Sequence, residues 1–536
     1  MALSQSGETM KTIDAKSLKS LVHAAHAGNG GELALLDVRE HGQYGEGHPF
    51  FAVSCPYSIL ELRAPQLVPR KATAVVVYDD ADGISGKAAK RLEAIGYSDV
   101  TVLEGGAPGW AAAGFTLYQG VNLPSKTFGE LVELDRHTPH ISAQDLKDMQ
   151  DRGDNIIILD GRTPEEYGNF NIPGGISCPN AELPLRFDAM VGDPETTVVI
   201  NCAGRTRSII GAQTLIDFGV AQKVVALENG TQGWALIDLE LERGADRFAP
   251  DALDGDALAA AKARSDALIA KDGLSKVDAA TLAQWQTDGS RSIYLIDVRS
   301  RGEFEAGHLP GARWVPGGQL VQATDLTVGT LGARIVVCDD NEVRAAMAAH
   351  WLRQMGRDVY ILEGGIGEAG TEKGSVELGL DPNRVAELPE VSEIPEGAAV
   401  IDMRASQDYR DGHVPGAKWV WRGQLDTVAS HVQGKPVVLV ADDDDAARLA
   451  ALDIAELGGG AVSALAGGMT AWQAVGGTPE VTPNDPPDEL RNDFLFFTGH
   501  RHMGNKADMR KYLEWEIGLV GQLDADERAA FKLPGD

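Results

Sequence analysis

The strongest constraint on this chain is a pattern that it repeats four times. Each copy begins with an apolar, β-branched run that ends in the signature Asp-x-Arg. A second apolar run follows, and the residue directly after it lies at the same distance from a later glycine in every copy. The four pairs are Asp79 and Gly96, Cys202 and Gly219, Asp339 and Gly356, and Ala441 and Gly458. Equal spacing aligns the copies without gaps, so we expect four tandem domains of one fold.

Within each copy, short apolar strands alternate with helix-like segments. This order predicts an α/β fold in which every domain is a small parallel-type sheet flanked by helices. A length of 536 residues also requires several domains. We expect linkers near 120–140 and 250–275. The predicted domains are residues 1–125, 135–255, 270–382 and 383–482, with a C-terminal extension at 483–536.

Net charge and cysteine content exclude several classes of function. The chain has 48 basic and 79 acidic residues, a net charge of −31, so no surplus of lysine and arginine can neutralise nucleic-acid phosphates. No long apolar run or secretory leader pattern is present, so we expect a cytoplasmic protein without a membrane segment. The four cysteines lack CxxC spacing, which argues against a disulfide framework or a zinc site. Reduced thiols fit the same compartment.

The stretch TTVVINCAGRTRS at 196–208 predicts a strand that delivers Cys202 into a loop before a helix. Backbone N–H groups at a helix start lack intrahelical partners and favour an anion in such a loop. Together with Arg205 and Arg207 they are expected to lower the pKa of Cys202. Gly204 allows the backbone to turn inward, and Ser208 either caps the helix or is a surface serine. Taken alone, Cys202 fits a buried structural cysteine equally well.

Several motifs together resemble the rhodanese (sulfurtransferase) family. They are the Asp-x-Arg strands, the turns GHLPGA at 307–312 and GHVPGA at 412–417, the strand-to-cysteine loop, and endings such as LEGGAPGW at 103–110. The resemblance implies that Cys202 is the nucleophile, which takes a sulfane sulfur as a persulfide and passes it on. It also implies that Ala203, Gly204, Arg205, Thr206 and Arg207 form the substrate-binding loop, without metal or organic cofactor. Phosphatases of the same fold resemble this loop but have one more residue in it, so the shorter loop favours sulfur chemistry.

The other three copies lack the cysteine. Asp79, Asp339 and Ala441 stand at its position, so only the second domain is expected to form a persulfide, with the others bracing or shielding it. Cys338 precedes Asp339 by one residue and should point to the opposite face of the strand. Cys55 and Cys178 have no basic neighbours in sequence, and we interpret all three as packing residues.

Five further positions need an interpretation. Arg186 lies where the family often places a pocket residue, and it either binds an anionic donor or is a solvated surface arginine. Asp160 and Arg162 are expected to form a structural ion pair. His500 and His502 lack the further ligands that a metal site needs, so we expect no metal there. We expect their segment, with a strand-like start at 494–497 and a helix over 506–519, to pack over a neighbouring domain near the catalytic pocket.

The predicted function is sulfur transfer from a donor such as thiosulfate to cyanide or a thiol, with a protein sulfur acceptor also open. Glutathione persulfide and 3-mercaptopyruvate remain alternative donors. A second hypothesis is a sulfur carrier or interaction scaffold with a dedicated partner, suggested by the three copies without cysteine. Phosphatase or arsenate reductase chemistry is disfavoured by the loop length. By analogy with two-domain rhodaneses, we expect the first domain to pair with the second and the third with the fourth.

Overall fold

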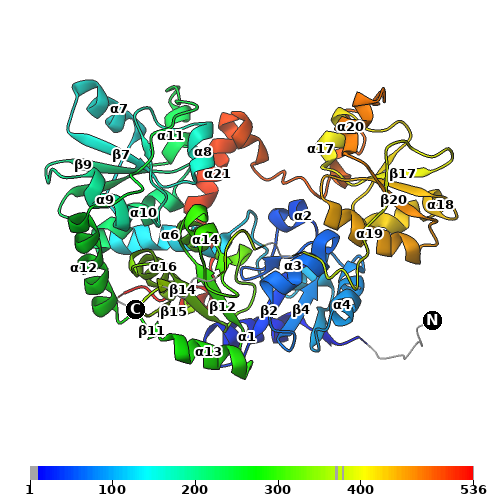
Figure 1. Cartoon of the computed structure of the whole chain (residues 1–536), viewed down its shortest axis with the longest axis horizontal. Helices are drawn as coiled ribbons and strands as arrows, with labels where there is room; N and C mark the ends of the chain where they lie inside the picture. Colours follow the sequence, from blue (N-terminus) through cyan, green and yellow to red (C-terminus); the bar gives the residue numbers. More distant parts are fainter. Residues whose placement is uncertain (1–9, 368–371, 377–378, 535–536) are drawn as a thin grey trace. The chain divides into compact units, whose positions relative to one another are not determined.

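The four sequence repeats form four parallel sheets. The computed structural model describes residues 10–367, 372–376 and 379–534, and in it each repeat is a five-stranded sheet with the strand order of β1-β5-β4-β2-β3 (Figure 1). Every strand pair whose register is defined is parallel, as for β9 with β7 and β10. The predicted α/β fold with four repeated sheets is therefore confirmed.

The fourth strand of each repeat lies at the centre of its sheet and is the strand that leads to the cysteine position. The first sheet holds β1 (Thr12–Ile13), β2 (Leu33–Asp37), β3 (Val53–Ser54), β4 (Ala74–Tyr78) and β5 (Val100–Leu103). The second holds β6 (His140–Ile141), β7 (Ile156–Asp160), β8 (Ile176–Ser177), β9 (Thr197–Asn201) and β10 (Lys223–Leu227). The third holds β11 (Lys276–Val277), β12 (Ile293–Asp297), β13 (Arg313–Trp314), β14 (Arg334–Cys338) and β15 (Asp358–Leu362). The fourth holds β16 (Glu390–Val391), β17 (Ala399–Asp402), β18 (Lys418–Trp419), β19 (Val437–Val440) and β20 (Val462–Leu465).

Helices follow the strands in every repeat. Repeat one has α1 (Ala15–His26), α2 (His41–Glu46), α3 (Leu60–Leu67), α4 (Ile84–Ala94) and α5 (Gly106–Ala112). Repeat two has α7 (Ala143–Arg152), α8 (Pro164–Asn169), α9 (Leu183–Met190), α10 (Thr206–Asp217) and α11 (Gly230–Leu236). Repeat three has α13 (Ala279–Asp288), α14 (Arg301–Ala306), α15 (Gly317–Gln322) and α16 (Val343–Gln354), and repeat four has α17 (Ser406–Asp411), α18 (Ala429–Val432), α19 (Asp444–Glu456) and α20 (Gly468–Ala474). The C-terminal extension carries α21 (Lys506–Gly518) and α22 (Ala525–Ala529).

Two segments that the sequence suggested as linkers are helices. They are α6 (Leu123–Arg136) and α12 (Gly255–Asp272). The alanine-rich composition of α12 favours a helix, and it packs against α9 and α16. Helix α6 packs against α10, the helix that follows the Cys202 loop.

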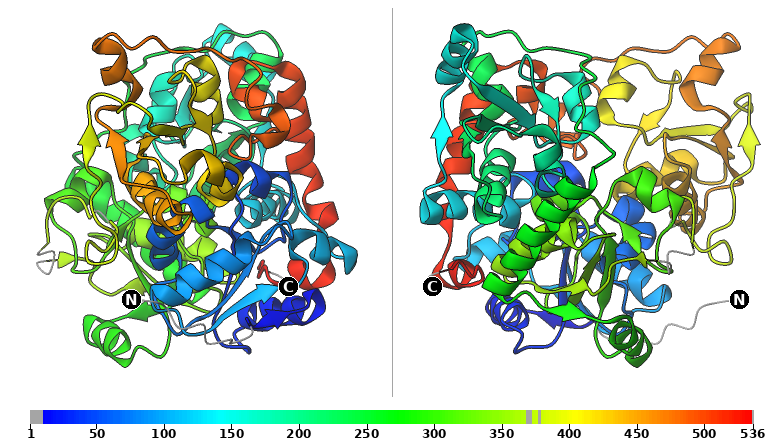
Figure 2. Two further views of the ribbon diagram at one scale, coloured as in Figure 1. Left: turned by 90° about the vertical axis from the view of Figure 1, so that its right-hand side faces the viewer. Right: turned by 60° about the vertical axis from the view of Figure 1, so that its left-hand side comes forward.

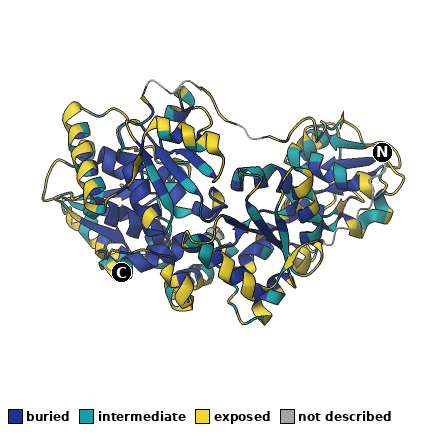
Figure 3. Ribbon diagram, turned by 90° about the horizontal axis from the view of Figure 1, so that it is seen from below, coloured by how far each residue is buried: buried dark blue, intermediate teal, exposed yellow. Residues whose placement is uncertain are grey.

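Both faces of the second sheet are buried, as the β-branched strands predict. Val198 and Ile200 of β9 pack against α9 and α10, whereas Val199 packs against α7 and α11 on the other face. Figure 3 shows the same burial across the strands of the chain, which are mostly dark blue. This alternation is what a parallel sheet covered by two helical layers requires.

The repeats group differently from the predicted pairing. Repeats one and four belong to one compact unit, and repeats two and three form the other together with α21. The prediction that repeat one pairs with two and repeat three with four was therefore wrong. Buried ion pairs join the repeats within each unit: Arg422 of repeat four with Glu61 of repeat one, and Arg344 of repeat three with Glu182 of repeat two.

The predicted helix of the C-terminal extension is confirmed as α21, but the strand-like start before it is not a strand. Phe494 and Phe496 lie in a loop, where their rings meet edge to face and Arg491 lies over both. Aromatic packing in a loop produces the same apolar run as a strand, so the sequence pattern could not separate the two. Over the described residues, none of the helices has the length and apolar character needed to span a membrane.

Arg422 offers a test of the pairing of repeats one and four. Its side chain is fully buried, donates to Glu61 at 2.6 and 2.8 Å and to Asp453 at 3.1 Å, and its removal leaves two carboxylates buried. We expect Arg422→Ala to lower the free energy of unfolding of this unit by about 3–5 kcal/mol. Hydrogen exchange of the β4 amides measures the change.

The matched control is Lys11→Ala, which removes an exposed ion pair with Asp99 in the same unit. We expect less than about 1 kcal/mol there. Equal exchange in the two variants would contradict the role assigned to Arg422.

Candidate active site

Cys202 follows the central strand β9 directly, as the sequence predicts, and α10 begins four residues later at Thr206. Ser208, in the first turn of α10, lowers the pKa of the thiol, and its hydroxyl donates to the Arg205 carbonyl at 2.8 Å. Cys202 is only 2% exposed. The strand, the loop and the first turn of α10 thus form a cradle of donors around one sulfur atom.

A second element fixes the carbonyl side of this loop. The Thr231 amide donates to the Cys202 carbonyl at 2.8 Å, and the Gln232 amide donates to the Ala203 carbonyl at 3.1 Å. Both amides belong to the first turn of α11, where Gly230 has a φ of +51°. A Cβ at Gly230 would lie 2.2 Å from the Cys202 carbonyl oxygen, so only glycine permits this close approach.

The repeats without cysteine show what the cradle binds. The Asp79 carboxylate accepts from the amides of Ala81, Gly83 and Ser85 at 2.9–3.0 Å. In repeat three, Asp339 accepts from the amides at 341, 342, 344 and 345. Each of these aspartates is therefore an internal anion in its own loop. In these acidic loops the carboxylate itself occupies the anion position.

The two arginines of the loop are paired with carboxylates. Arg205 donates to Glu130 of α6 at 2.8 and 2.9 Å and also contacts Glu133. Arg207 donates to Glu166 of α8 at 2.6 and 2.7 Å. The predicted basic loop is thus electrically balanced, because its partners come from helices distant in the sequence.

The C-terminal helix α21 packs over the loop. A Cβ placed on Gly204 would lie 3.1 Å from Glu516 Oε2 and 3.3 Å from Tyr512, both on α21. Thr206 donates to Glu516 Oε1 at 3.2 Å. Figure 2 shows α21 in red alongside the helices of repeat two. The expectation that the extension packs over a neighbouring domain near Cys202 is confirmed.

The pKa of Cys202 differs from its prediction. Burial raises the pKa of the thiol above its ordinary value, Arg207 and Ser208 lower it, and the Glu516 carboxylate raises it. The net direction is upward, so the predicted lowering was wrong. The prediction counted the cradle and the arginines but not the desolvation and the carboxylate that α21 brings.

Arg186 lies apart from the Cys202 loop. It lines a cleft of about 490 Å³ between repeats two and three, together with Phe248 and Trp314, and Cys202 does not line this cleft. Its guanidinium donates to Glu182 at 2.7 Å and to the carbonyl of Pro250. The structure therefore brings the residues from Ala203 to Arg207 together with Cys202, but not Arg186.

Asp160 and Arg162 form the predicted structural pair. The guanidinium donates to both carboxylate oxygens at 2.7–3.2 Å, and the same pair recurs in the other repeats. Arg162 also donates to the carbonyl of Phe170 at 2.6 Å, which ties the turn after α8 to the end of β7.

The other three cysteines are buried packing residues, as expected. Cys338 packs with Leu282 of α13, and burial raises the pKa of its thiol well above the ordinary value. Burial likewise raises the pKa of Cys55 to about 12 and raises that of Cys178.

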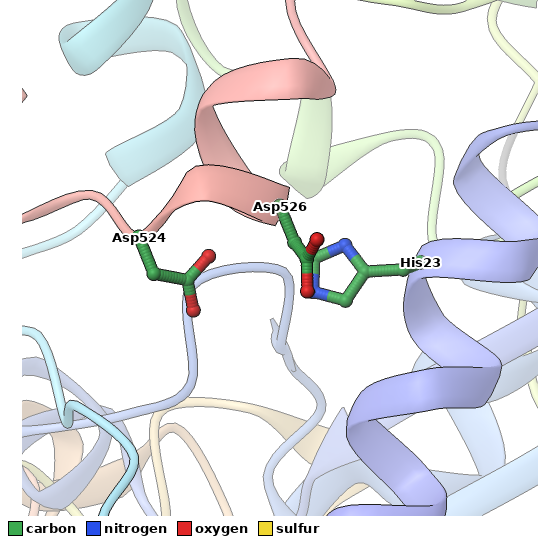
Figure 4. Close-up of side chains that lie close together, drawn as sticks. All are labelled: His23, Asp524 and Asp526. Atoms are coloured by element: carbon green, nitrogen blue, oxygen red, sulfur yellow. The ribbon is translucent and has the colours of Figure 1, made fainter.

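The histidines of the extension form no ligand set among the described residues. His500 lies 3.5 Å from Asp508, and the side chain of His502 is outside the described part. The described residues do contain a group of His23, Asp524 and Asp526 with ligand atoms close together (Figure 4). Asp524 already accepts from the Glu527 amide at 2.8 Å as the cap of α22, which accounts for its position.

Comparison with known proteins identifies the fold. Residues 15–113, 142–236, 278–369 and 386–475 each match the family described as "Rhodanese-like domain". The chain belongs to this family. It is a tandem array of four rhodanese-like domains, as the motifs indicated.

One solved relative resembles the chain over nearly its whole length. A crystal structure described as thiosulfate sulfurtransferase from Pseudomonas aeruginosa is 41% identical, with a TM-score of 0.87 over 97% of this chain and 99% of that chain. Two curated Bacillus subtilis proteins match shorter segments. "Uncharacterized protein YqhL" is 42% identical over 78 residues, and "Putative sulfur carrier protein YrkF" is 30% identical over 96 residues. The matches span 14% and 18% of this chain and 60% and 50% of those proteins.

Sequence reasoning missed three parts of the site. Ser208 was treated as a cap or a surface serine, yet it is 1% exposed, its hydroxyl donates to the Arg205 carbonyl, and it lowers the pKa of the thiol. The role of Gly230 was predictable from the glycine pair in the LEGG motif near the end of repeats one and three. The second glycines of those motifs, Gly106 and Gly365, approach the carbonyls of Asp79 and Asp339 in the same way. Glu516 carries no signal in the sequence.

Ser208 allows a test of the cradle. Ser208 lowers the pKa of Cys202 and its hydroxyl donates to the Arg205 carbonyl of the loop, so Ser208→Ala removes a group that stabilises the thiolate. A hydrogen bond to a charged group is worth about 1.5–3 kcal/mol, so we expect the midpoint of Cys202 alkylation against pH to rise by about one to two units. Peptide mapping after iodoacetamide treatment measures the midpoint.

Ser142→Ala serves as the control, because Ser142 caps α7 at an exposed position of the same domain. Its alkylation profile should match the wild type. An unchanged or lower midpoint in Ser208→Ala would show that the hydroxyl does not stabilise the thiolate.

Proposed function

We propose that the chain is a sulfurtransferase in which Cys202 of the second domain carries sulfur as a persulfide. The observation that carries this proposal is the cradle: the same loop position that holds a carboxylate anion in repeats one and three holds a thiol in repeat two. A position built for an anion stabilises a thiolate and then a persulfide anion without reorganisation.

Thiosulfate is the proposed donor, supported by the solved relative described as a thiosulfate sulfurtransferase. The Cys202 thiolate attacks the outer sulfur, a new S–S bond forms, and the old S–S bond breaks so that sulfite leaves with its electron pair. Cyanide or a thiol then attacks the outer sulfur of the persulfide, and Cys202 leaves as a thiolate. Each half-reaction leaves an anion on Cys202, first the persulfide and then the thiolate, which the loop is proposed to stabilise.

The roles of the remaining loop residues follow from their contacts. Residues 206–208 form the first turn of α10, and Arg205 and Arg207 hold the loop to α6 and α8 through their carboxylate partners. Arg186 lines a separate cleft, and we propose it only as a contact for ligands bound between repeats two and three.

A second candidate is a carrier that passes the persulfide sulfur to a dedicated protein acceptor. Its support is the likeness of one segment to a protein described as a putative sulfur carrier, and the cover that α21 places over the thiol. A carrier forms the same Cys202 persulfide but turns over slowly with cyanide.

The test is thiocyanate formation from thiosulfate and cyanide, with the mass of the Cys202 peptide recorded after donor alone. We expect the wild type to gain the mass of one sulfur atom on Cys202 and to release thiocyanate. Cys202→Ala should lose both signals, because the other three cysteines lie in hydrophobic core clusters.

Cys338→Ala is the matched control, since Cys338 is buried beside the corresponding loop of repeat three. It should keep both signals. A persulfide without thiocyanate turnover would favour the carrier, and no persulfide on folded wild-type protein would contradict both functions.

A further inference from the structure

One buried carboxylate oxygen faces the Cys202 loop without a partner. Glu516 is 1% exposed, and its Oε1 receives hydrogen bonds from Tyr512 at 2.9 Å, Thr206 at 3.2 Å and Lys126 at 3.3 Å. Its Oε2 is buried and has no hydrogen-bond partner among the described residues. The side chain is thus anchored through one oxygen while the other is left available.

The available oxygen points at the loop that holds the thiol. Glu516 Oε2 is the atom nearest to a Cβ built on Gly204, at 3.1 Å, and the carboxylate acts electrostatically on Cys202. A buried acceptor without a donor costs free energy, so native structures keep one where a ligand or a proton is to be received. The proton that the proposed reaction must remove is that of the Cys202 thiol in the same loop.

We propose that Glu516 Oε2 accepts the proton of the Cys202 thiol when sulfur is loaded and returns it when sulfur is released. This inference rests on the proposed function. It assigns the C-terminal extension a role in the chemistry of the second domain, through a residue that lies 310 positions from Thr206 in the sequence.

The proton and electron balance closes over the two half-reactions. In the first, the thiol proton moves to the carboxylate, the thiolate forms a bond to the outer sulfur of thiosulfate, and sulfite leaves. In the second, the acceptor takes that sulfur, and the Cys202 thiolate regains the proton from Glu516. No oxidant or reductant beyond donor and acceptor is required.

Other charged groups around the pair come from several elements. Helix α6 contributes Lys126 and Glu130, the start of α10 contributes Arg205 and Arg207, α8 contributes Glu166, and α21 and the preceding turn contribute Tyr512 and Arg501. Lys126 and Tyr512 contact Glu516 itself, Arg501 lies over the Tyr512 ring, and the other groups are joined in the ion pairs already described. Glu516 Oε2 is the carboxylate oxygen among them that is buried without a partner.

The experiment compares wild type with Glu516→Gln in single-turnover loading by thiosulfate, followed by the mass of the Cys202 peptide. Removing a negative charge near the thiol favours the thiolate and the anionic donor, so electrostatics alone predicts faster loading by the variant. Loss of a proton acceptor predicts the opposite. We expect loading at pH 7 to slow by about 10²-fold, in line with general-base contributions of about 10²–10⁴.

The pH dependence separates this role from a structural one. At a pH above the alkylation midpoint of Cys202 in the same variant, the thiol ionises without help, so the rate of Glu516→Gln should approach that of wild type. A misfolded site would stay slow at every pH. Glu514→Gln is the matched control, because Glu514 is an exposed residue of the same helix, and it should load like the wild type.

Loading by Glu516→Gln at or above the wild-type rate at pH 7 would overturn the inference and leave the proposed function intact. A deficit that persists at high pH would overturn it as well. If wild type itself forms no persulfide with thiosulfate, it is the proposed function that fails, and the inference fails with it.

Discussion

Backbone amides without a helical partner are the constraint on which all four domains depend. In each repeat the central strand ends where a helix begins, and the first amides of that helix need an acceptor. Asp79 and Asp339 supply a carboxylate from the cysteine position itself. In repeat four, where that position is Ala441, Asp443 caps the helix by accepting from the amides of Asp445 and Ala446. Only repeat two has a cysteine at this position. The same backbone arrangement therefore forms a structural loop in the other repeats and, under the proposed function, a reactive loop in repeat two.

Charge balance is the second theme of the site. Arg205 and Arg207 do not form a free basic patch, because helices α6 and α8 bring carboxylates to them. Repeat three keeps the equivalent pair, Arg344 with Glu303, although its cysteine position is an aspartate. These pairs therefore hold the loop in place in both repeats, and under the proposed function the reactivity of Cys202 depends on the rest of its loop and on the carboxylate that α21 brings.

The sequence was informative where the interactions are local. The β-branched run before Cys202 predicted the strand, and the equal spacing to Gly219 predicted the helix, because both patterns follow from residues that are near one another in the chain. The partners of Arg205 and Gly204 were not predictable in this way, since Glu130 and Glu516 reach them through tertiary packing. The predicted pairing of the repeats failed for the same reason: it rested on order along the chain, whereas the buried pair of Arg422 and Glu61 joins the first and last repeats.

The position of α21 at the end of the chain has a consequence for synthesis. A ribosome completes the second domain long before it reaches Glu516, so the nascent chain presents Cys202 without its cover or its proton acceptor. A chain that stops before α21 retains the cradle but leaves the thiol open to unregulated oxidants. Because α21 follows the second domain in the chain, the proposed proton acceptor reaches the Cys202 loop only after that domain has been synthesised.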